Sequence, residues 1–593
     1  MSTLAQVGAK HVAKGVGRFT ELVMTEGKGS YVKTECGRQI LDFTCGIGVT
    51  NLGHCHPGVT KAAQEQVGTL VHGQVNLGYN KPYLQLIEKL LPVMPHKSLD
   101  SFFFWNSGAE AVEASIKLAR HATGKQNVIV VQGSYHGRTF GTMALTKSKT
   151  IYGAGYAPLM PGVFTTPYPY WHQLGLPHTT SNDELVENAL YRLELLLKQE
   201  TAPRDTAAIL IEPVLGEGGY IPAPKGYLEG LRRICDENGL LLIIDEVQTG
   251  FGRTGKYFAI EHWPEVVPDV LVMAKGIANG FPLSGIVSRK ELMDKQPAGS
   301  QGGTYGGNAV ACAAGGAVQD AFKNEGVLEN VAARSEELFG LFRELQADET
   351  IGECIAEVRG LGLMVGVEFK SPTDRYTPAK GKVPAKMASR VQNKCLEKDL
   401  LVLTTSVYET IRFIPPLNIS KEDMAKGCAI IRQAIVDVVR GIASVSPLYT
   451  TTATSSGSRA DGKATTESGL ELPMDLPKAL GGAGKKHNPE ELFGAAYGTC
   501  FLSALGATHG NLNKGSKPLP KSTKVDAVVT IGKDAEEKLP GFLLAVELKV
   551  HAAPLKEVGL NDQQVKQLVD EAHKMCPYSR AVAGNVDVKL TIV

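Results

Sequence analysis

The sequence has no long apolar run and no excess of charge of either sign. No stretch of about 18 apolar residues, the length a membrane-spanning helix needs, occurs in its 593 residues. The 62 Lys and Arg residues nearly balance the 61 Asp and Glu residues, for a formal net charge of +1. Such a balance gives no overall field that would attract nucleic acid or an anionic membrane surface. We therefore expect small-molecule partners, with neither nucleic acid nor a membrane among them.

Cysteine is also sparse. The chain has ten cysteines, and none belongs to a C-x-x-C pair. This argues against a disulfide scaffold and against a structural zinc site, and it fits a reducing compartment. The basic N-terminus (Lys10, Lys14 and Arg18 before Glu21) lacks the Ser- and Arg-rich amphipathic pattern of a transit peptide. We expect a cytoplasmic protein without a metal, with mitochondrial import as the alternative.

The length exceeds what one hydrophobic core usually serves, so two or three domains are expected. Between about residues 100 and 290, short apolar runs alternate with amphipathic segments, which predicts a parallel sheet covered by helices. Residues 320–440 have a mixed α+β pattern. At about 445–485 Thr, Ser, Gly and Lys accumulate. A disordered tail is the simplest explanation, but helix and strand patterns return beyond this segment and indicate a separate domain.

Individual elements can be placed from these patterns. The strands expected in the parallel sheet are Ser101–Trp105, Asn127–Val131, Ala207–Ile211, Leu240–Ile244 and Val270–Met273. In the C-terminal part, helices are expected at Glu490–Gly506 and Gln563–Met575, and strands at Lys524–Ile531, Leu543–His551 and Val586–Val593.

Two charged residues follow neighbouring apolar strands. Asp245 ends one strand and Lys275 follows another, so both should project from the carboxyl edge of one sheet, where open α/β sheets bind ligands. An enzyme that uses pyridoxal 5'-phosphate (PLP) needs such a pair: the lysine forms a Schiff base, and the carboxylate keeps the pyridine nitrogen protonated. Alone, however, a lysine after a strand is usually solvated.

Two further segments favour a PLP site. Asn106–Ala111 follows an apolar strand and opens a helix, whose free N–H groups would suit a phosphate, although an ordinary N-cap would look the same. Tyr135 and Arg138 follow the next strand. Tyr135 could stack on the cofactor ring and Arg138 could face a carboxylate, while core packing is the simpler explanation of Tyr135 taken alone.

Together these segments resemble class III (fold-type I) aminotransferases over about residues 10–442. The motifs that carry the resemblance are SGAEAVEASIKLAR, YHGRT, IEPVLGEGG, DEVQTGFGRTG, AKGIANGFPLSG, GGTYGGNAVAC and VRGLGLMVGVE. The sequence is most similar to 4-aminobutyrate aminotransferases, with lysine, ornithine, acetylornithine and β-alanine aminotransferases close behind. The resemblance implies an α/β fold: a mainly parallel large domain at about 60–320, and an α+β small domain from both termini of residues 1–442.

The resemblance also implies residue roles in the PLP site. Lys275 would bind the cofactor and carry the proton, Asp245 would pair with the pyridinium, and Gln248 would bond to the ring hydroxyl. The remaining cofactor contacts would be Tyr135 on the ring and, at the phosphate, Ser107, Gly108, Ala109 and Thr304. In this family Thr304 comes from the neighbouring subunit, so a homodimer or higher oligomer is implied.

Four positions bear on substrate choice by the same resemblance: Ile47, Arg138, Glu217 and Arg412. One pocket must accept an amino acid whose amine is remote from its carboxylate, and then a keto acid with an α-carboxylate. Glu217 could pair with Arg412 in the first half-reaction and release it in the second, because arginine binds carboxylates in a bidentate manner. A permanent structural ion pair is the alternative.

The C-terminal part contains a second candidate site, formed by Cys500 and Cys576. Buried free cysteines are the simplest explanation. Two thiols that meet could instead reduce peroxides, one becoming a sulfenic acid and the other resolving it as a disulfide.

Residues 449–593 resemble the organic-hydroperoxide-resistance branch of the OsmC/Ohr family, an α+β fold, on the motifs NPEELFGAAYGTCF and CPYS…GNVDV. The resemblance implies a peroxidatic Cys500, a resolving Cys576, and activation of the thiolate by Arg459 and Glu490. It further implies an organic hydroperoxide substrate and a lipoylated protein as reductant.

The sequence thus predicts a fusion of an aminotransferase (1–442) and a thiol peroxidase (449–593), joined by a short linker at 443–448. Two alternatives remain. The C-terminal domain could serve assembly only, or the peroxidase could be carried on an inactive aminotransferase scaffold.

Overall fold

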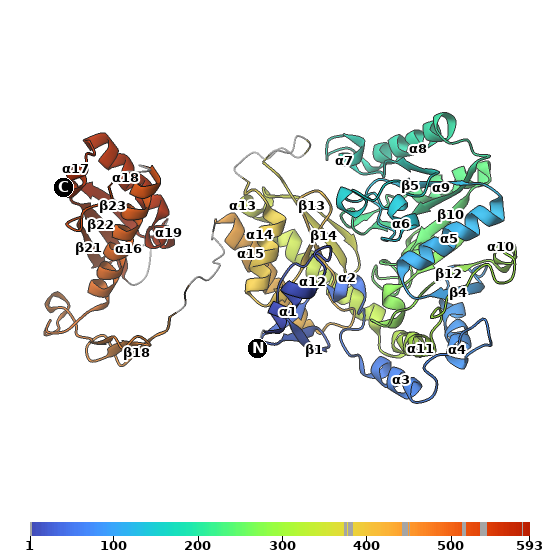
Figure 1. The fold of residues 1–593 in the computed structure, drawn as a ribbon, viewed down its shortest axis with the longest axis horizontal. Coiled ribbons are helices and arrows are strands. Elements are labelled where there is room, and N and C mark those ends of the chain that lie inside the picture. Colours follow the sequence, from blue (N-terminus) through green and yellow to red (C-terminus); the bar gives the residue numbers. More distant parts are fainter. Residues whose placement is uncertain are drawn as a thin grey trace. The chain divides into compact units, whose positions relative to one another are not determined.

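The computed structural model describes residues 3–372, 376, 383–441, 449, 451–512, 517–533, 542–583 and 585–593. Contacts between residues divide the chain into two compact units, Met1–Ser444 and Val445–Val593 (Figure 1). The expected linker at 443–448 lies outside the described residues, so its boundaries stay a prediction.

The first unit is built on a seven-stranded sheet of mainly parallel strands. Its strand order is β4-β12-β11-β10-β7-β5-β6, and β12 alone runs antiparallel to its neighbours. The strands are β4 (Ser101–Trp105), β5 (Asn127–Val131), β6 (Val163–Thr166), β7 (Thr206–Ile211), β10 (Leu241–Asp245), β11 (Val270–Met273) and β12 (Ser284–Ser288). This confirms the predicted fold class, and the five predicted strands match their observed bounds to within a residue at each end.

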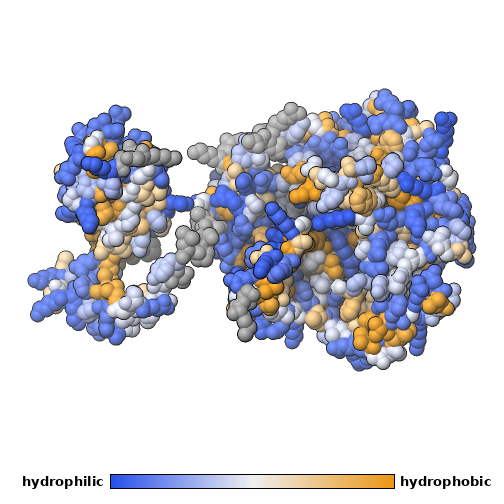
Figure 2. Space-filling view, viewed as in Figure 1, coloured by the Kyte–Doolittle hydropathy of each residue, from blue (hydrophilic) through white to orange (hydrophobic). Residues whose placement is uncertain are grey.

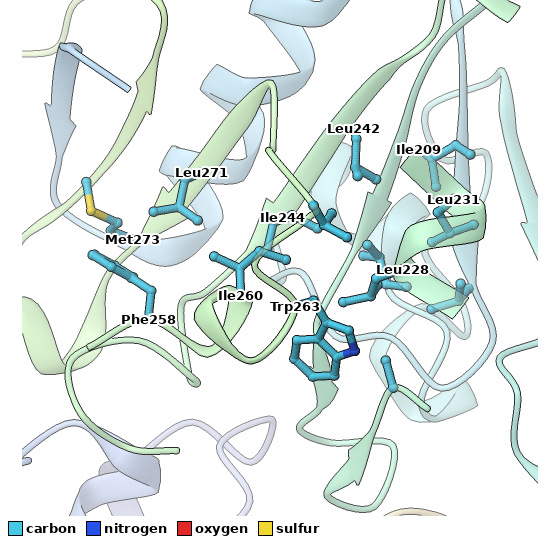
Figure 3. Packing of buried hydrophobic residues seen from close by; sticks show 14 of the residues in the cluster. Ile209, Leu228, Leu231, Leu242, Ile244, Phe258, Ile260, Trp263, Leu271 and Met273 are labelled. Carbon is cyan, nitrogen blue, oxygen red and sulfur yellow. The ribbon is translucent and has the colours of Figure 1, made fainter. Parts of the chain in front are cut away.

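Both faces of this sheet are buried, as the continuous apolar runs require. On one face, side chains of β10 and β11 pack against α9 (Tyr227–Asn238) and the short helix η3 (Ala259–His262), as Figure 3 shows for Ile244, Leu231 and Ile260. On the other face, Ile243 and Val272 pack toward α5 (Gly108–Thr123). Because side chains on both faces of the sheet are buried, only the strand ends are free to carry polar, catalytic groups.

Among the described residues, the first unit also contains two four-stranded sheets and one two-stranded sheet. One four-stranded sheet has the order β13-β14-β17-β16, and the other pairs the N-terminal strands with β15 from late in the unit. Their strands are β1 (Met24–Lys28), β2 (Tyr31–Thr34), β3 (Gln39–Asp42), β13 (Ile355–Leu361), β14 (Met364–Phe369), β15 (Leu400–Leu401), β16 (Leu403–Thr405) and β17 (Thr410–Phe413). A two-stranded pair, β8 (Val214–Leu215) and β9 (Ile221–Pro222), carries a tight turn between its strands.

The other α-helices of the first unit cover these sheets or connect their strands. They are α1 (Leu4–His11), α2 (Cys45–Gly48), α3 (Pro57–Val67), α4 (Lys81–Leu90), α6 (Phe140–Leu145), α7 (Trp171–Leu174), α8 (Asn182–Gln199), α10 (Lys290–Met293), α11 (Ala309–Asn324), α12 (Val327–Ala347), α13 (Glu349–Gly352), α14 (Met387–Glu397) and α15 (Lys421–Val439). Figure 2 shows apolar side chains gathered over the region of α4 and α11.

The second unit is an α+β structure with two sheets. Its central sheet has the order β21-β22-β23 and packs against α16. The elements are β18 (Ala453–Ser456), β19 (Lys463–Thr466), β20 (Glu471–Pro473), α16 (Pro489–Leu512), β21 (Val525–Gly532), β22 (Leu543–Val550), α17 (Ala552–Glu557), α18 (Asp562–Met575), α19 (Pro577–Val582) and β23 (Asp587–Ile592). The Thr- and Ser-rich segment therefore contains a three-stranded sheet, β18–β20, which its composition did not predict.

Within the described part of the chain, none of the helices combines the length and the apolar character required to cross a bilayer.

Candidate active sites

A cavity of about 420 Å³ opens where strands of the large sheet end. Lys275, Asp245, Gln248, Tyr135, Arg138 and Glu217 all line it, together with Ser107, Gly108 and Ala109. The sequence patterns placed Lys275, Asp245, Tyr135, Arg138 and residues 107–109 at strand ends or a helix start far apart along the chain, and the resemblance added Gln248 and Glu217. The structure brings them to one pocket.

Asp245 lies at the end of β10 and is held by neighbours on both oxygens. Its Oδ2 is 2.7 Å from Nδ1 of the buried His136, and its Oδ1 accepts a hydrogen bond from the Val247 N–H at 2.9 Å. Glu212, another buried carboxyl at the end of β7, accepts hydrogen bonds from the N–H groups of Tyr135 and Gly216. Burial raises the pKa of Glu212 to about 7, with His136 acting to lower it and Asp245 to raise it.

Lys275 follows β11 in the left-handed backbone region, at φ +49°, which is unusual for a residue with a side chain. Burial of its amine lowers the pKa to about 8, while Glu217 acts to raise it and Arg412 to lower it. A lysine with this pKa carries a much larger neutral fraction near pH 7 than an exposed lysine. Its nitrogen can therefore act as a nucleophile and as a proton carrier.

The start of α5 provides an anion site beside this lysine. Ser107 caps the helix through a hydrogen bond to the Glu110 N–H, so the helix begins at Gly108, and the first N–H groups of a helix have no partner within it. A Cβ on Gly108 would lie 3.0 Å from Cγ1 of Val247, a tight contact that would require the valine side chain to shift, so glycine suits this close approach. Gly108 and Ala109 thus present N–H groups to the cavity.

These residues fit PLP. The carboxylate of Asp245 suits a protonated pyridine nitrogen, and the helix start suits a phosphate. In addition, the Gln248 Oε1 atom is buried at the cavity with no hydrogen-bond partner among the described residues, so the carboxamide is available to a ring substituent.

Two arginines were expected to bind the substrate: Arg138 lines the cavity, whereas Arg412 is outside its lining and is paired with Glu217, which lines it. Arg138 donates from Nε to the Tyr135 hydroxyl at 3.0 Å, and its guanidinium lies 4.8 Å from the ring centre of Tyr152. Arg412, on β17, donates from Nη1 to Glu217 Oε1 at 2.5 Å, and both side chains are nearly buried. Glu217 itself lines the cavity. A ligand carboxylate could therefore meet Arg138 directly, and could meet Arg412 once Glu217 moved aside.

Besides Arg412, two predicted site residues lie outside the lining of this cavity. Thr304 is exposed, and its predicted contact with a cofactor in the partner subunit stays a prediction. Ile47 is 40% exposed and takes a left-handed conformation inside α2; its substrate contact also stays a prediction.

The second unit brings the two predicted thiols together. Cys576 Sγ is 3.8 Å from Cys500 Sγ, and both are free cysteines. Burial raises the pKa of Cys500, Tyr578 acts to lower it through a backbone hydrogen bond, and Cys576 acts to raise it. Arg459 forms an ion pair with Glu490, but it is not among the groups that shift the pKa of Cys500. Its activating role stays a prediction.

Comparison with known proteins identifies both units. The model of the class-III aminotransferase family matches residues 11–435. The chain belongs to this family. It is 39% identical to the 5-aminovalerate aminotransferase DavT of Pseudomonas aeruginosa over 71% of this chain and 95% of that protein. It is 37% identical to the 4-aminobutyrate aminotransferase GabT of Escherichia coli over 72% of this chain and 97% of that protein.

A solved structure supports the cofactor. The ornithine aminotransferase of Toxoplasma gondii, whose structure has partial occupancy of PLP at the active site, superposes with a TM-score of 0.63 at 26% identity, covering 74% of this chain and 95% of that one. Like its family, this class-III aminotransferase uses PLP. The model of OsmC-like proteins matches residues 482–591, so the second unit contains an OsmC-like domain.

Sequence reasoning missed two residues of the cavity. Glu212 follows the buried strand β7 in the way that Asp245 follows β10, so the strand-end argument could have found it. His136 lies beside Tyr135 in the sequence, but only the fold shows that its ring reaches Asp245.

Proposed function

We propose that this aminotransferase moves the amino group of an ω-amino acid, such as 4-aminobutyrate or 5-aminovalerate, to 2-oxoglutarate. The observation that carries this proposal is the pair Glu217–Arg412 beside Arg138. An ω-amino acid brings one carboxylate, which Arg138 binds, while Glu217 neutralises Arg412. A dicarboxylic keto acid brings a second carboxylate, which takes the place of Glu217 on Arg412.

The protein groups divide the remaining work. Bound PLP supplies an aldehyde that reacts with amines and a ring that accepts electrons. Asp245, oriented by His136, keeps the ring nitrogen protonated, and the N–H groups of Gly108 and Ala109 hold the phosphate. Lys275 Nζ would take the proton from the carbon on one side of the transferred nitrogen and return it to the carbon on the other side. Its lowered pKa of about 8 suits both steps, because catalytic groups work best with a pKa near the operating pH.

The similar proteins favour 4-aminobutyrate and 5-aminovalerate among the possible donors. The similar proteins DavT and GabT are named for ω-amino acids. Acetylornithine, ornithine, lysine and β-alanine also carry amines remote from a carboxylate and remain alternative donors. The family resemblance implies a homodimer or higher oligomer with Thr304 contributed across the interface. The sequence favours the cytoplasm, with mitochondrial import as the alternative.

A second activity is supported by the distance between Cys500 and Cys576. We infer that the OsmC-like domain reduces organic hydroperoxides. The Cys500 thiolate would attack the peroxide, forming an S–O bond and breaking the O–O bond, with an alcohol as the leaving product. The Cys576 thiol would then displace water from the sulfenic acid to form a disulfide, which a dithiol such as a lipoylated protein reduces. An assembly role without catalysis is the alternative.

Arg412→Ala tests the proposed switch. The change removes one carboxylate partner, so the half-reaction with 2-oxoglutarate should slow by about 10- to 100-fold, the cost of a charge-assisted contact. The half-reaction with 4-aminobutyrate should change much less. Single-turnover kinetics of each half, followed by absorbance, measure the two effects separately.

Glu217→Gln is the matched control, because it frees Arg412 without removing it. It should impair the ω-amine half-reaction more than the keto-acid half-reaction. Equal losses in both halves for Arg412→Ala would instead indicate a permanent structural ion pair.

A further inference from the structure

The turn that carries Glu217 is fixed to the sheet β13-β14-β17-β16, which we call the small sheet, by contacts that the proposed switch does not use. We define the Glu217 turn as Gly216–Tyr220, between β8 and β9. We infer that Arg359 and Thr405 are positioning residues that hold the backbone of this turn, so that the Glu217 side chain can leave Arg412 while the turn stays in place. This inference rests on the proposed function.

Arg359 holds one end of the turn. It is a buried residue on β13, and its Nε donates to the Gly219 carbonyl at 3.0 Å. Gly219 has φ +130°, and a Cβ there would lie 3.0 Å from Arg359 Nη2, so the guanidinium fits directly against the glycine backbone. Any residue with a Cβ at this position would displace the arginine, so the approach requires glycine.

The arginine is itself fixed by buried acidic and aromatic groups. Its Nη1 lies 2.7 Å from Glu368 Oε2 and 2.7 Å from Glu357 Oε2, and its guanidinium lies 5.2 Å from the ring centre of Tyr170. Glu368 also accepts a hydrogen bond from Tyr170 and lies 2.7 Å from Nε2 of His172. A guanidinium with this many partners has one orientation, which makes it a rigid anchor.

Thr405 holds the other end. Its hydroxyl donates to the carbonyls of Glu217 and Gly216, at 3.1 and 3.3 Å. The neighbouring Ser406 N–H donates to the same Glu217 carbonyl at 2.9 Å. The backbone of Glu217 is therefore bonded to β16 and its following residue, independently of the carboxylate that reaches Arg412.

The register of the small sheet places Arg359 and Arg412 next to the Glu217 turn. Gly366 on β14 pairs with Arg359 on one side and with Arg412 on the other. A Cβ on Gly366 would lie 3.0 Å from Tyr220 Cβ and 3.1 Å from the Gly219 carbonyl, so the turn rests on this glycine. Arg359, Gly366 and Arg412 thus lie side by side on three adjacent strands. Arg359 binds the backbone of the Glu217 turn, and Arg412 binds the Glu217 side chain.

Binding of unreactive acids to the PLP-loaded protein tests this inference by calorimetry. Glutarate has two carboxylates and must compete with Glu217 for Arg412, whereas valerate, of the same length, has one. Arg359→Lys keeps the charge that Glu368 needs but loses the fixed Nε donor, so the Glu217–Arg412 pair should weaken. Glutarate should then bind up to about tenfold more tightly, the value of one charge-assisted hydrogen bond, with valerate unchanged.

Thr405→Val is the second variant, which removes the hydroxyl without changing size or charge. It should shift the ratio of glutarate to valerate affinity in the same direction by about threefold. Arg232→Lys is the matched control: Arg232 lies on α9, bonds to the Val267 carbonyl and pairs with Asp269, and its replacement should leave the ratio unchanged.

The double variant Arg359→Lys/Glu217→Gln separates this inference from the proposed switch. Glu217→Gln alone should raise glutarate affinity, and adding Arg359→Lys should then have no further effect on the ratio. If Glu217→Gln leaves the ratio unchanged, the switch itself is wrong. If it raises the ratio while neither Arg359→Lys nor Thr405→Val does, or if the Arg359→Lys effect persists in the double variant, the positioning role is wrong.

Discussion

Lys275→Ala is expected to lower transamination by at least about 10³-fold, a loss in the range of a removed general acid–base group. Burial lowers the pKa of its amine to about 8, and Asp245 and Glu217, which line the same cavity, both act on that pKa. The alanine variant has no amine at this position to carry the proton. Steady-state rates with 4-aminobutyrate and 2-oxoglutarate measure the loss.

The control must separate this chemistry from folding. Lys125→Ala removes another partly buried lysine, which donates to the Gly239 carbonyl away from the cavity, and should keep full activity. Visible absorbance and circular dichroism check that Lys275→Ala still binds PLP and folds. An Lys275→Ala protein that transaminates at the normal rate would overturn the assignment of this lysine.

Cys500→Ser is expected to abolish consumption of cumene hydroperoxide or tert-butyl hydroperoxide by the full chain, while transamination stays intact. Serine is a far weaker nucleophile than a thiolate toward the peroxide oxygen, and the two sites belong to different compact units. The assay follows loss of hydroperoxide with a lipoyl dithiol as reductant.

Cys576→Ser should behave differently, because it retains the attacking thiol. This variant should react once and then accumulate over-oxidised Cys500, since no thiol resolves the sulfenic acid. Cys428→Ser, in the first unit, serves as the control and should change nothing. Mass spectrometry after peroxide treatment decides the matter: without a Cys500–Cys576 disulfide in the native protein, the proposed cycle is wrong.

Residues whose place depends on one strand or helix were predictable from the sequence. Asp245 and Lys275 follow apolar strands of the parallel sheet, and the strand direction alone brings them to one edge. Gly108 follows from the strand-to-helix pattern in the same way. These local signals identified the proposed lysine, its carboxylate partner and the phosphate-binding helix start of the cavity lining, whereas Gln248 and Glu217 followed only from the family resemblance.

Residues whose role depends on contacts between distant segments could not be derived from spacing. Arg359 is separated from Gly219 by 140 positions, and only the pairing of β13, β14 and β17 places it under the Glu217 turn. The polar strands β18–β20 were missed for another reason. Their Thr, Ser and Lys residues are mostly exposed on both faces, so they lack the apolar alternation that predicts a strand.

The central claim, transfer from an ω-amino acid to 2-oxoglutarate, is tested most directly by a donor panel. Purified protein would be given 2-oxoglutarate and, in turn, 4-aminobutyrate, 5-aminovalerate, β-alanine, ornithine, lysine or N-acetylornithine, with glutamate formation measured by mass spectrometry. We predict that 4-aminobutyrate or 5-aminovalerate gives the highest kcat/KM. A highest kcat/KM with N-acetylornithine, or no glutamate from either predicted donor, would contradict the account.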